Sequence, residues 1–119
     1  MENQNLAHLE TLLDLLSEGK FIEGMETFFA DDVEIREVGQ APKRGRDHCI
    51  AVEKDLLEGV SEFIQYTAHS KGAGGDTTFY EATMEFKTKD GQHVIQNQAV
   101  VTTWQNGKIV NERYYHNNI

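Results

Sequence analysis

The strongest structural signal lies in the second half of the sequence, where four segments rich in aromatic and β-branched residues follow one another. Such residues favour β-strands. The dipeptides Asp90-Gly91 and Asn106-Gly107 are typical of two-residue hairpin turns, and three glycines between positions 72 and 75 mark an earlier connection. Segments 63–69, 77–88, 94–104 and 109–115 are therefore predicted to pair in succession as strands.

The first half of the chain has the pattern of helices. Leucines at positions 6, 9, 12, 13 and 16 recur at helical spacing, and Asn5 and Gly19 suit the two ends of this first helix. Apolar residues at 21, 22, 25, 28 and 29 indicate a second helix, which Asp31-Asp32 should end. Asp47 can cap a third helix that ends near Gly59.

A first strand fits between the second and third helices, because Val33 and Ile35 alternate with polar residues, and residues 39–45 then form a loop. The order helix, helix, strand, helix and four strands is of the α+β class, since parallel crossovers would need helices between the later strands. We predict one domain over residues 1–119, a curved antiparallel sheet wrapped by three N-terminal helices. A hollow between sheet and helices could hold a small ligand.

Composition excludes several partners. A formal net charge of -9 repels nucleic-acid phosphates and anionic lipids, so we expect no nucleic acid and no membrane as partner. The basic stretch Lys43, Arg44 and Arg46 lacks aromatic neighbours and is interpreted as a solvated loop. The first residues have neither a basic start nor an unbroken apolar run, and the single Cys49 cannot form an internal disulfide. These features predict a cytoplasmic protein.

No cofactor is predicted. The histidines at positions 8, 48, 69, 93 and 116 are scattered, without the spacing of metal ligands, so we expect no metal site. The glycines at 72, 74 and 75 join two strands rather than open a helix, which argues against a phosphate-binding loop.

Three motifs resemble those of a known family. They are Phe29-Ala30-Asp31-Asp32-Val33 at the helix-to-strand corner, Gly45-Arg46-Asp47 at the start of the third helix, and Asn106-Gly107-Lys108-Ile109-Val110 before the last strand. In this order they resemble the SnoaL-like branch of the nuclear-transport-factor-2-like superfamily, which includes ketosteroid isomerases, polyketide cyclases, scytalone dehydratase and limonene epoxide hydrolase. The resemblance implies a cone-shaped fold with a pocket for a small molecule.

The resemblance also suggests a catalytic base. In ketosteroid isomerases the first strand carries a proton-shuttling aspartate shortly after the paired aspartates, and Glu37 lies at that place. A partly desolvated carboxylate within reach of a carbon-bound proton can remove it. The alternative is a solvated acid at a frayed strand end. The isomerase tyrosine and protonated aspartate fall near Leu12 and Val100, which cannot donate hydrogen bonds, so steroid isomerisation is not expected.

Strand alternation predicts the other walls of the pocket. With Glu37 inward, Val110 on the last strand brings Glu112, Tyr114 and His116 to the same side; the alternative is the opposite facing, with Ile109, Asn111, Arg113 and Tyr115 inward. His116 could then form an acid–base pair with Glu37, or could be exposed and mobile near the end of the chain. The predicted ligand-binding residues are Tyr80, Met84, Gln98, Val100, Thr102, Trp104, Glu112 and Tyr114.

Two functions remain open from the sequence. The first is binding of a small, largely apolar molecule with acid–base chemistry of the cyclase, isomerase or dehydratase type. The second is a ligand-binding or assembly module without chemistry, because a fold does not fix a function. A homodimer through the outer sheet face is compatible with both, and Ile95, Val101, Ile109 and Tyr115 are the apolar residues expected on that face.

Overall fold

The computed structural model describes residues 2–116 and contains three helices and one six-stranded sheet. The helices are α1 (Glu2–Ser17), α2 (Phe21–Phe28) and α3 (Arg46–Glu58). The strands are β1 (Phe29–Glu37), β2 (Lys43–Arg44), β3 (Val60–Gly74), β4 (Thr77–Thr88), β5 (His93–Gln105) and β6 (Lys108–His116). This confirms the predicted α+β fold, with the short β2 as an addition.

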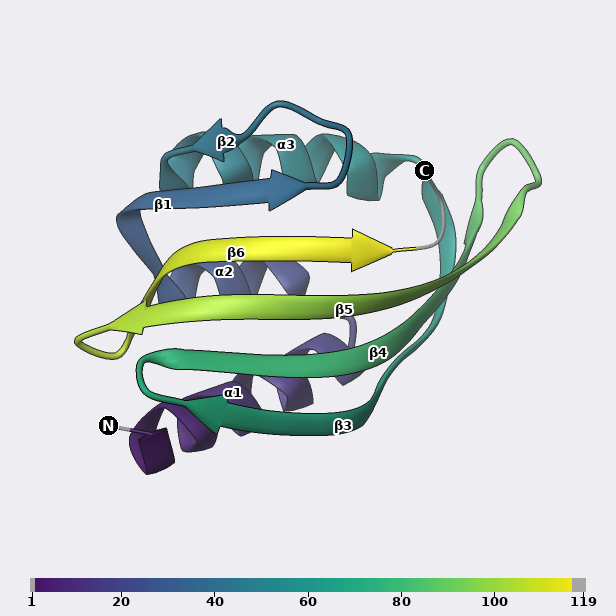
Figure 1. The fold of residues 1–119 in the computed structure, drawn as a ribbon. Helices are drawn as coiled ribbons and strands as arrows, with labels where there is room; N and C mark the ends of the chain where they lie inside the picture. The colour runs from purple at the N-terminus through teal and green to yellow at the C-terminus, as the bar shows by residue number, and fades with distance from the viewer. Residues whose placement is uncertain (1, 117–119) are drawn as a thin grey trace.

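The strands lie in the order β2-β1-β6-β5-β4-β3, and the helices cover one face of the curved sheet (Figure 1). Helix α1 packs on β3 and β4, α3 packs on β1 and β2, and α2 lies against both other helices. The sheet is mixed rather than wholly antiparallel, because β1 pairs with β6 in parallel. A parallel pair is possible here because α3 and the strands β2 to β5 separate β1 from β6 along the chain.

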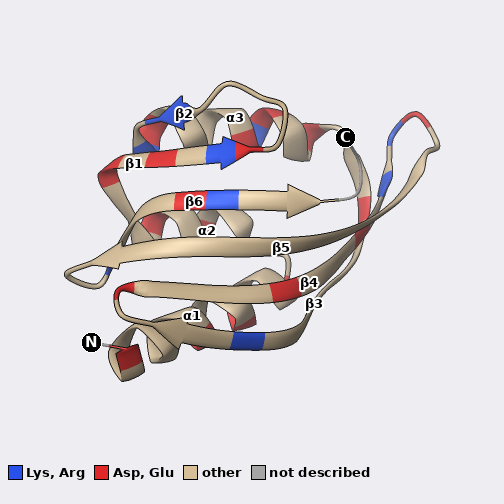
Figure 2. Cartoon of the chain, in the orientation of Figure 1, with Lys and Arg blue, Asp and Glu red and all other residues tan. Residues whose placement is uncertain are grey.

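The core lies between the helices and the concave face of the sheet. Leucines of α1 meet inward side chains of the central strands, and the rings of Phe28 and Trp104 pack edge to face at 5.9 Å. The least exposed apolar side chains are Leu9, Val33, Val100 and Ile109, at 0%. Charged residues lie mainly outside this core, and in Figure 2 Lys and Arg are scattered among Asp and Glu without forming a basic stripe.

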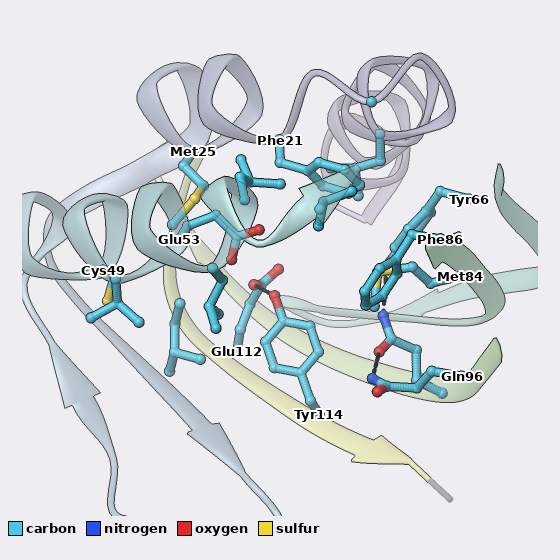
Figure 3. Close-up of a pocket in the computed structure, with 18 of the residues that line it drawn as sticks. Phe21, Met25, Cys49, Glu53, Tyr66, Met84, Phe86, Gln96, Glu112 and Tyr114 are labelled. Atoms are coloured by element: carbon cyan, nitrogen blue, oxygen red, sulfur yellow. Dashed lines mark hydrogen bonds between the residues drawn. The ribbon is translucent and has the colours of Figure 1, made fainter. Parts of the chain in front are cut away.

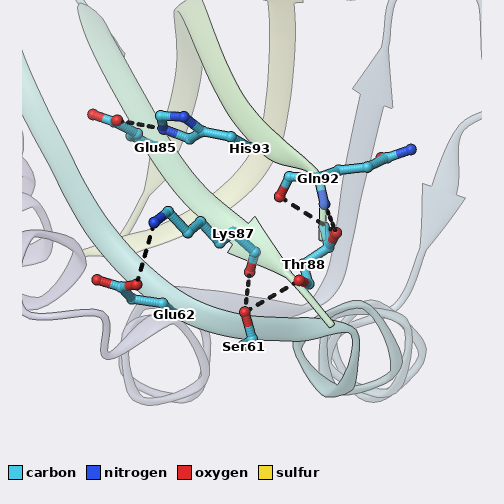
Figure 4. A network of polar contacts seen from close by, with 7 residues as sticks. All are labelled: Ser61, Glu62, Glu85, Lys87, Thr88, Gln92 and His93. Atoms are coloured by element: carbon cyan, nitrogen blue, oxygen red, sulfur yellow. Dashed lines mark hydrogen bonds and ion pairs between the residues drawn. The ribbon is translucent and has the colours of Figure 1, made fainter. Parts of the chain in front are cut away.

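The predicted Asn106-Gly107 turn is a two-residue turn with left-handed backbone at Asn106 (φ 55°) and Gly107 (φ 78°), whereas Asp90-Gly91 lies in a longer connection between β4 and β5 that is closed by a hydrogen bond from Thr88 N to the carbonyl of Gln92. The geometry of the Asn106-Gly107 turn matches the twist of the flanking strands. At the other end of the sheet, polar contacts join the start of β3 to the end of β4 (Figure 4). Ser61 Oγ donates to the carbonyl of Lys87 at 3.2 Å, and His93 Nε2 lies 2.6 Å from Glu85 Oε2.

Several boundaries differ from the sequence prediction. Helix α1 begins at Glu2, so Asn5 is a buried residue within it rather than its cap, and α3 begins at Arg46, so Asp47 lies in its first turn. Strand β1 begins at Phe29, so Asp31-Asp32 lie inside an irregular part of this strand and do not end α2. The expected loop at 39–45 contains β2, whose Arg44 Nε donates to Glu34 Oε2 on β1 at 2.8 Å. Strand β3 extends through Gly72, against which the ring of Phe79 packs.

The predicted outer face also needs a correction. Ile109, which was expected to point outward, is fully buried, because the register shifts between the pairs Thr103–Asn111 and Trp104–Ile109. The shift inserts one extra residue, Val110, so Ile109 and Glu112 both face the core. Ile95 and Tyr115 do lie outward, each 50% exposed.

Candidate functional site

A cavity of about 500 Å³ lies between the concave face of the sheet and the helices. Every helix and every strand contributes to its wall. Its apolar lining includes Leu12, Leu16, Phe21, Met25, Phe29, Ile35, Val52, Phe63, Met84 and Phe86. The polar side chains that line it are Glu37, Lys43, Glu53, Tyr66, Tyr80, Thr88, Gln96, Gln98, Glu112 and Tyr114. A largely apolar cavity with a few polar groups is the usual form of a small-molecule site.

Glu112 on β6 is a buried carboxyl group in the wall of this cavity, with 2% of the residue exposed. The hydroxyl groups of Tyr114 and Thr102 donate to its two oxygens, the second at 3.3 Å. Burial raises the pKa of Glu112 to about 7, although the hydrogen bonds from Tyr114 and Thr102 oppose the rise. Both protonation states are therefore populated near neutral pH, as general acid–base chemistry requires.

A chain of hydrogen bonds runs across β3, β4 and β5 on the opposite part of the wall. Gln96 Nε2 donates to Gln98 Oε1 at 2.7 Å, and Gln98 Nε2 donates to the hydroxyl of Tyr66 at 2.8 Å. The hydroxyl groups of Tyr66 and Tyr80 lie 2.8 Å apart. Burial raises the pKa of both tyrosines above the ordinary value, so both hydroxyl groups stay protonated at neutral pH.

Glu53 brings a second acid into the cavity from α3. In Figure 3 its carboxyl group points toward that of Glu112, while Tyr66, Met84 and Phe86 lie together to one side. Burial raises the pKa of Glu53, the nearby charge of Glu37 raises it further, and Lys43 partly offsets both effects. Cys49 lies one turn earlier on α3, and burial raises the pKa of its thiol.

Glu37 is half-buried at an edge of the cavity, on β1. Its carboxylate lies 3.8 Å from Lys43 Nζ and 3.8 Å from His116 Nε2. The His116 side chain is only 7% exposed, although it does not line the cavity. Glu37 also borders a smaller hollow of about 190 Å³, between β1 and β6, with Arg36 and Arg113. Glu37 and His116 are thus brought together, with a lysine beside them.

The eight predicted ligand-binding residues divide into two groups. Tyr80, Met84, Gln98, Glu112 and Tyr114 line the cavity. Val100, Thr102 and Trp104 face the same side of the sheet but do not line it, because their end of β5 is covered by α1 and the Phe28 ring. There Trp104 Nε1 donates to the buried Thr78 hydroxyl at 2.8 Å, so these residues form part of the core.

Tyr66, Gln96 and Glu53 line the cavity but are not among the predicted ligand-binding residues. Tyr66 was hidden by a register shift between Phe63 and Gln65, which breaks strand alternation on β3. Gln96 shares the inward face of β5 with Gln98, as strand alternation indicates. Glu53 follows Cys49 by four positions, and this helical spacing places both on one face of α3.

The described residues also bear on the requirements for a metal site and for a membrane-spanning helix. Among residues 2–116, His, Cys, Asp and Glu side chains form no group of three that could hold a metal ion. No helix in this part of the chain combines the length and apolar character needed to cross a membrane.

Solved structures share the fold at low sequence identity. A candidate SnoaL-like polyketide cyclase from Jannaschia sp. CCS1 superposes with a TM-score of 0.85 at 16% identity, covering 98% of this chain and 88% of its own. Another candidate SnoaL-like polyketide cyclase, from Mesorhizobium loti, superposes with a TM-score of 0.81 at 21% identity, covering 92% of this chain and 97% of its own. An LEH-like epoxide hydrolase of M. tuberculosis superposes with a TM-score of 0.81 at 20% identity, covering 98% of this chain and 84% of its own. These likenesses establish the fold alone.

The sequence itself gives a family match. No curated protein matches the chain. The profile of the SnoaL-like domain matches residues 9–112, a span that runs from α1 to the cavity-lining Glu112 on β6. Because this match covers most of the 119 residues and agrees with the observed fold, the chain belongs to the SnoaL-like domain family.

Proposed function

We propose that this protein binds a small, largely apolar molecule in the 500 Å³ cavity and that Glu112 exchanges a proton with it. The observation that carries the proposal is the setting of the Glu112 carboxyl group. It is almost fully buried, faces an apolar cavity, and forms no ion pair with a basic side chain among residues 2–116. A carboxyl group without a cation partner is costly to bury, and such groups are often retained for chemistry.

The hydrogen bonds around Glu112 fit both directions of proton transfer. In the ionised form, one carboxylate oxygen accepts a hydrogen bond from Tyr114 and the other accepts one from Thr102. Each oxygen has two lone pairs, so each keeps one lone pair free for a proton. The ionised form can therefore take a proton from a bound molecule, and the protonated form can return it elsewhere on the same molecule. This is acid–base chemistry of the kind needed for isomerisation or cyclisation.

Binding in the cavity can be tested by filling it. Val52 on α3 lines the cavity, whereas the neighbouring Ala51 is exposed on the same helix and does not line it. We expect Val52→Trp to abolish the binding of ethylnaphthalene measured by titration calorimetry, and Ala51→Trp to leave it unchanged. Equal binding by the two variants would place the ligand outside this cavity.

Proton transfer can be tested with nitrobenzisoxazole, an apolar carbon acid. A base takes its ring C–H proton, the released electron pair forms a nitrile, and the N–O bond breaks to give a coloured phenoxide. We expect Glu112→Gln to lower this rate by about 100-fold or more. The wild-type rate should rise as pH increases through about 7, because only the ionised carboxylate acts as base. Equal rates for the wild type and Glu112→Gln would remove Glu112 from the chemistry.

Glu37 and His116 form a second candidate acid–base pair, favoured by the 3.8 Å between the Glu37 carboxylate and His116 Nε2. Unlike Glu112, the Glu37 carboxylate already has a cationic partner, because Lys43 Nζ lies 3.8 Å from it. We expect Glu37→Gln to reduce nitrobenzisoxazole turnover far less than Glu112→Gln does. The reverse order of effects would assign the chemistry to Glu37.

The proposal includes a homodimer formed through the outer face of the sheet. Phe79 on β4, Ile95 on β5 and Tyr115 on β6 are each about half exposed on this face. Pairing of two copies would remove these apolar side chains from water. We expect sedimentation at micromolar concentration to give a dimer, and Phe79→Lys with Ile95→Lys to give a monomer. A wild-type monomer under these conditions would contradict a dimer.

A further inference from the structure

The Tyr66 and Tyr80 hydroxyl groups have more donor hydrogens than protein acceptors. The two groups carry two hydrogens and share one hydrogen bond of 2.8 Å. The Tyr66 oxygen also accepts from Gln98 Nε2 at 2.8 Å. Whichever tyrosine donates in the shared bond, the hydrogen of the other has no acceptor among the described residues.

This remaining hydrogen belongs to a group that is buried and lines the cavity. Tyr66 and Tyr80 are 5% and 4% exposed, and both are part of the cavity wall. A buried donor without an acceptor costs more free energy than an acceptor with a free lone pair. The Gln98 oxygen accepts from Gln96, and the Gln98 nitrogen faces Tyr66, so the Gln98 amide gives the tyrosine pair a donor and not an acceptor.

We propose that the Tyr66–Tyr80 pair donates a hydrogen bond to a carbonyl oxygen of the bound molecule, so that the ligands of this cavity are apolar carbonyl compounds. This inference rests on the proposed function, since it assumes that the cavity is a binding site. A carbonyl group has acceptors and no donor, which matches the surplus hydrogen. A hydrocarbon would leave the buried hydroxyl without a partner.

The placement of Glu112 makes a carbonyl compound chemically consistent. When the ionised Glu112 carboxylate takes a proton from the carbon next to a carbonyl, the C–H electron pair forms a carbon–carbon double bond. The carbonyl π electrons move to oxygen, which becomes an enolate. Donors aimed at the oxygen where charge develops stabilise this state strongly. The tyrosine pair and Glu112 occupy different parts of one cavity wall, as the two ends of such a molecule require.

The pair differs from the donors expected by resemblance to the isomerases. Those were expected near Leu12 and Val100, whose side chains cannot donate, and Val100 does not line the cavity. The tyrosine pair comes instead from the adjacent strands β3 and β4, with Tyr66 displaced by the register shift on β3.

The test compares acetonaphthone, a ketone, with ethylnaphthalene, which has a similar shape and no oxygen. We expect the double variant Tyr66→Phe and Tyr80→Phe to bind the ketone about tenfold more weakly, with hydrocarbon binding unchanged. Each single variant should lose less, because the remaining tyrosine keeps a hydrogen for the ketone. Tyr115→Phe, on the outer face, is the control and should bind both probes as the wild type does.

Infrared spectroscopy of the bound ketone gives a second reading that does not depend on the folding of a variant. The carbonyl stretch should lie at lower frequency in the wild-type complex than in hexane, because a donated hydrogen bond weakens the C=O bond. A hexane-like frequency, or equal loss of both probes in the double variant, would overturn the carbonyl proposal. If the wild type binds the hydrocarbon but not the ketone, the cavity is a binding site and this inference is wrong; if it binds neither, both proposals fail.

Discussion

Replacement of Glu112 by glutamine should change how the stability of the fold depends on pH. The carboxyl group has an ordinary pKa of 4.5 and a pKa of about 7 in the folded protein, because it is buried. Below pH 4.5 it is protonated in both the folded and the unfolded chain, so it has no effect on the balance between them. As pH rises from 4.5 to about 7, the unfolded chain releases its proton first and the folded state loses stability.

The size of this effect follows from the same two values. At about 1.4 kcal/mol for each pH unit, a pKa raised from 4.5 to about 7 costs the folded state about 3 kcal/mol above pH 7. Glutamine has a similar shape and cannot ionise. The difference in unfolding free energy, wild type minus Glu112→Gln, should therefore fall by about 3 kcal/mol between pH 4.5 and 7 and then stay level.

Urea unfolding at several pH values measures this difference directly. The chain has a single tryptophan, Trp104, which is 2% exposed in the folded state and reports unfolding by fluorescence. Glu10→Gln, at an exposed site on α1, controls for the loss of one charge from an acidic protein. A wild-type stability that rises with pH relative to Glu112→Gln, or a difference independent of pH, would refute the idea that Glu112 is buried without a compensating cation.

Three further substitutions test the packing that surrounds the site. Leu9→Ala, at a fully buried position, should lower the unfolding free energy by about 2–5 kcal/mol in urea titrations, and a loss below about 1 kcal/mol would contradict the described core. Gly107→Ala should cost about 1–2 kcal/mol, because φ is +78° and the new Cβ would lie 3.3 Å from His8 Cε1. Gly91→Ala, at φ +91° but in open space, should cost less, and the opposite order would show that the His8 contact is not limiting. Trp104→Phe, followed by circular dichroism, should cost about 2–3 kcal/mol because the fully buried Thr78 hydroxyl loses its donor; an unchanged midpoint would mean that this hydrogen bond adds no stability.

Much of the fold could be predicted because its signals are local. The Asn106-Gly107 turn needs only two residues that tolerate left-handed backbone, and the helix over 2–17 follows the spacing of its leucines. Strand β4 was predicted with its observed bounds, because alternation is unbroken from Thr77 to Thr88. The parallel pairing of β1 with β6 was not foreseen, since it joins segments more than 70 residues apart and has no local signal.

The candidate site was predictable only in part. Alternation brought Glu112 and Tyr114 to the inner face, although the extra residue at Val110 means that Ile109 shares this face as well. Alternation alone could not tell which inward side chains line a cavity and which fill the core. Val100 and Trp104 are covered by α1 and Phe28, whereas Gln98 on the same strand and Tyr80 on the neighbouring β4 remain open to the cavity.

The sequence by itself determined the order of elements, the turns and the face of each regular strand, because these depend on residues close together in the chain. Only the tertiary structure decided where the helices leave the sheet uncovered, and therefore which polar groups meet in the cavity. It placed Glu112 away from any ion-pair partner among the described residues, and it joined Tyr66 to Tyr80 across two strands. Desolvation and hydrogen-bond partners are properties of this packing, and they give these residues their proposed roles.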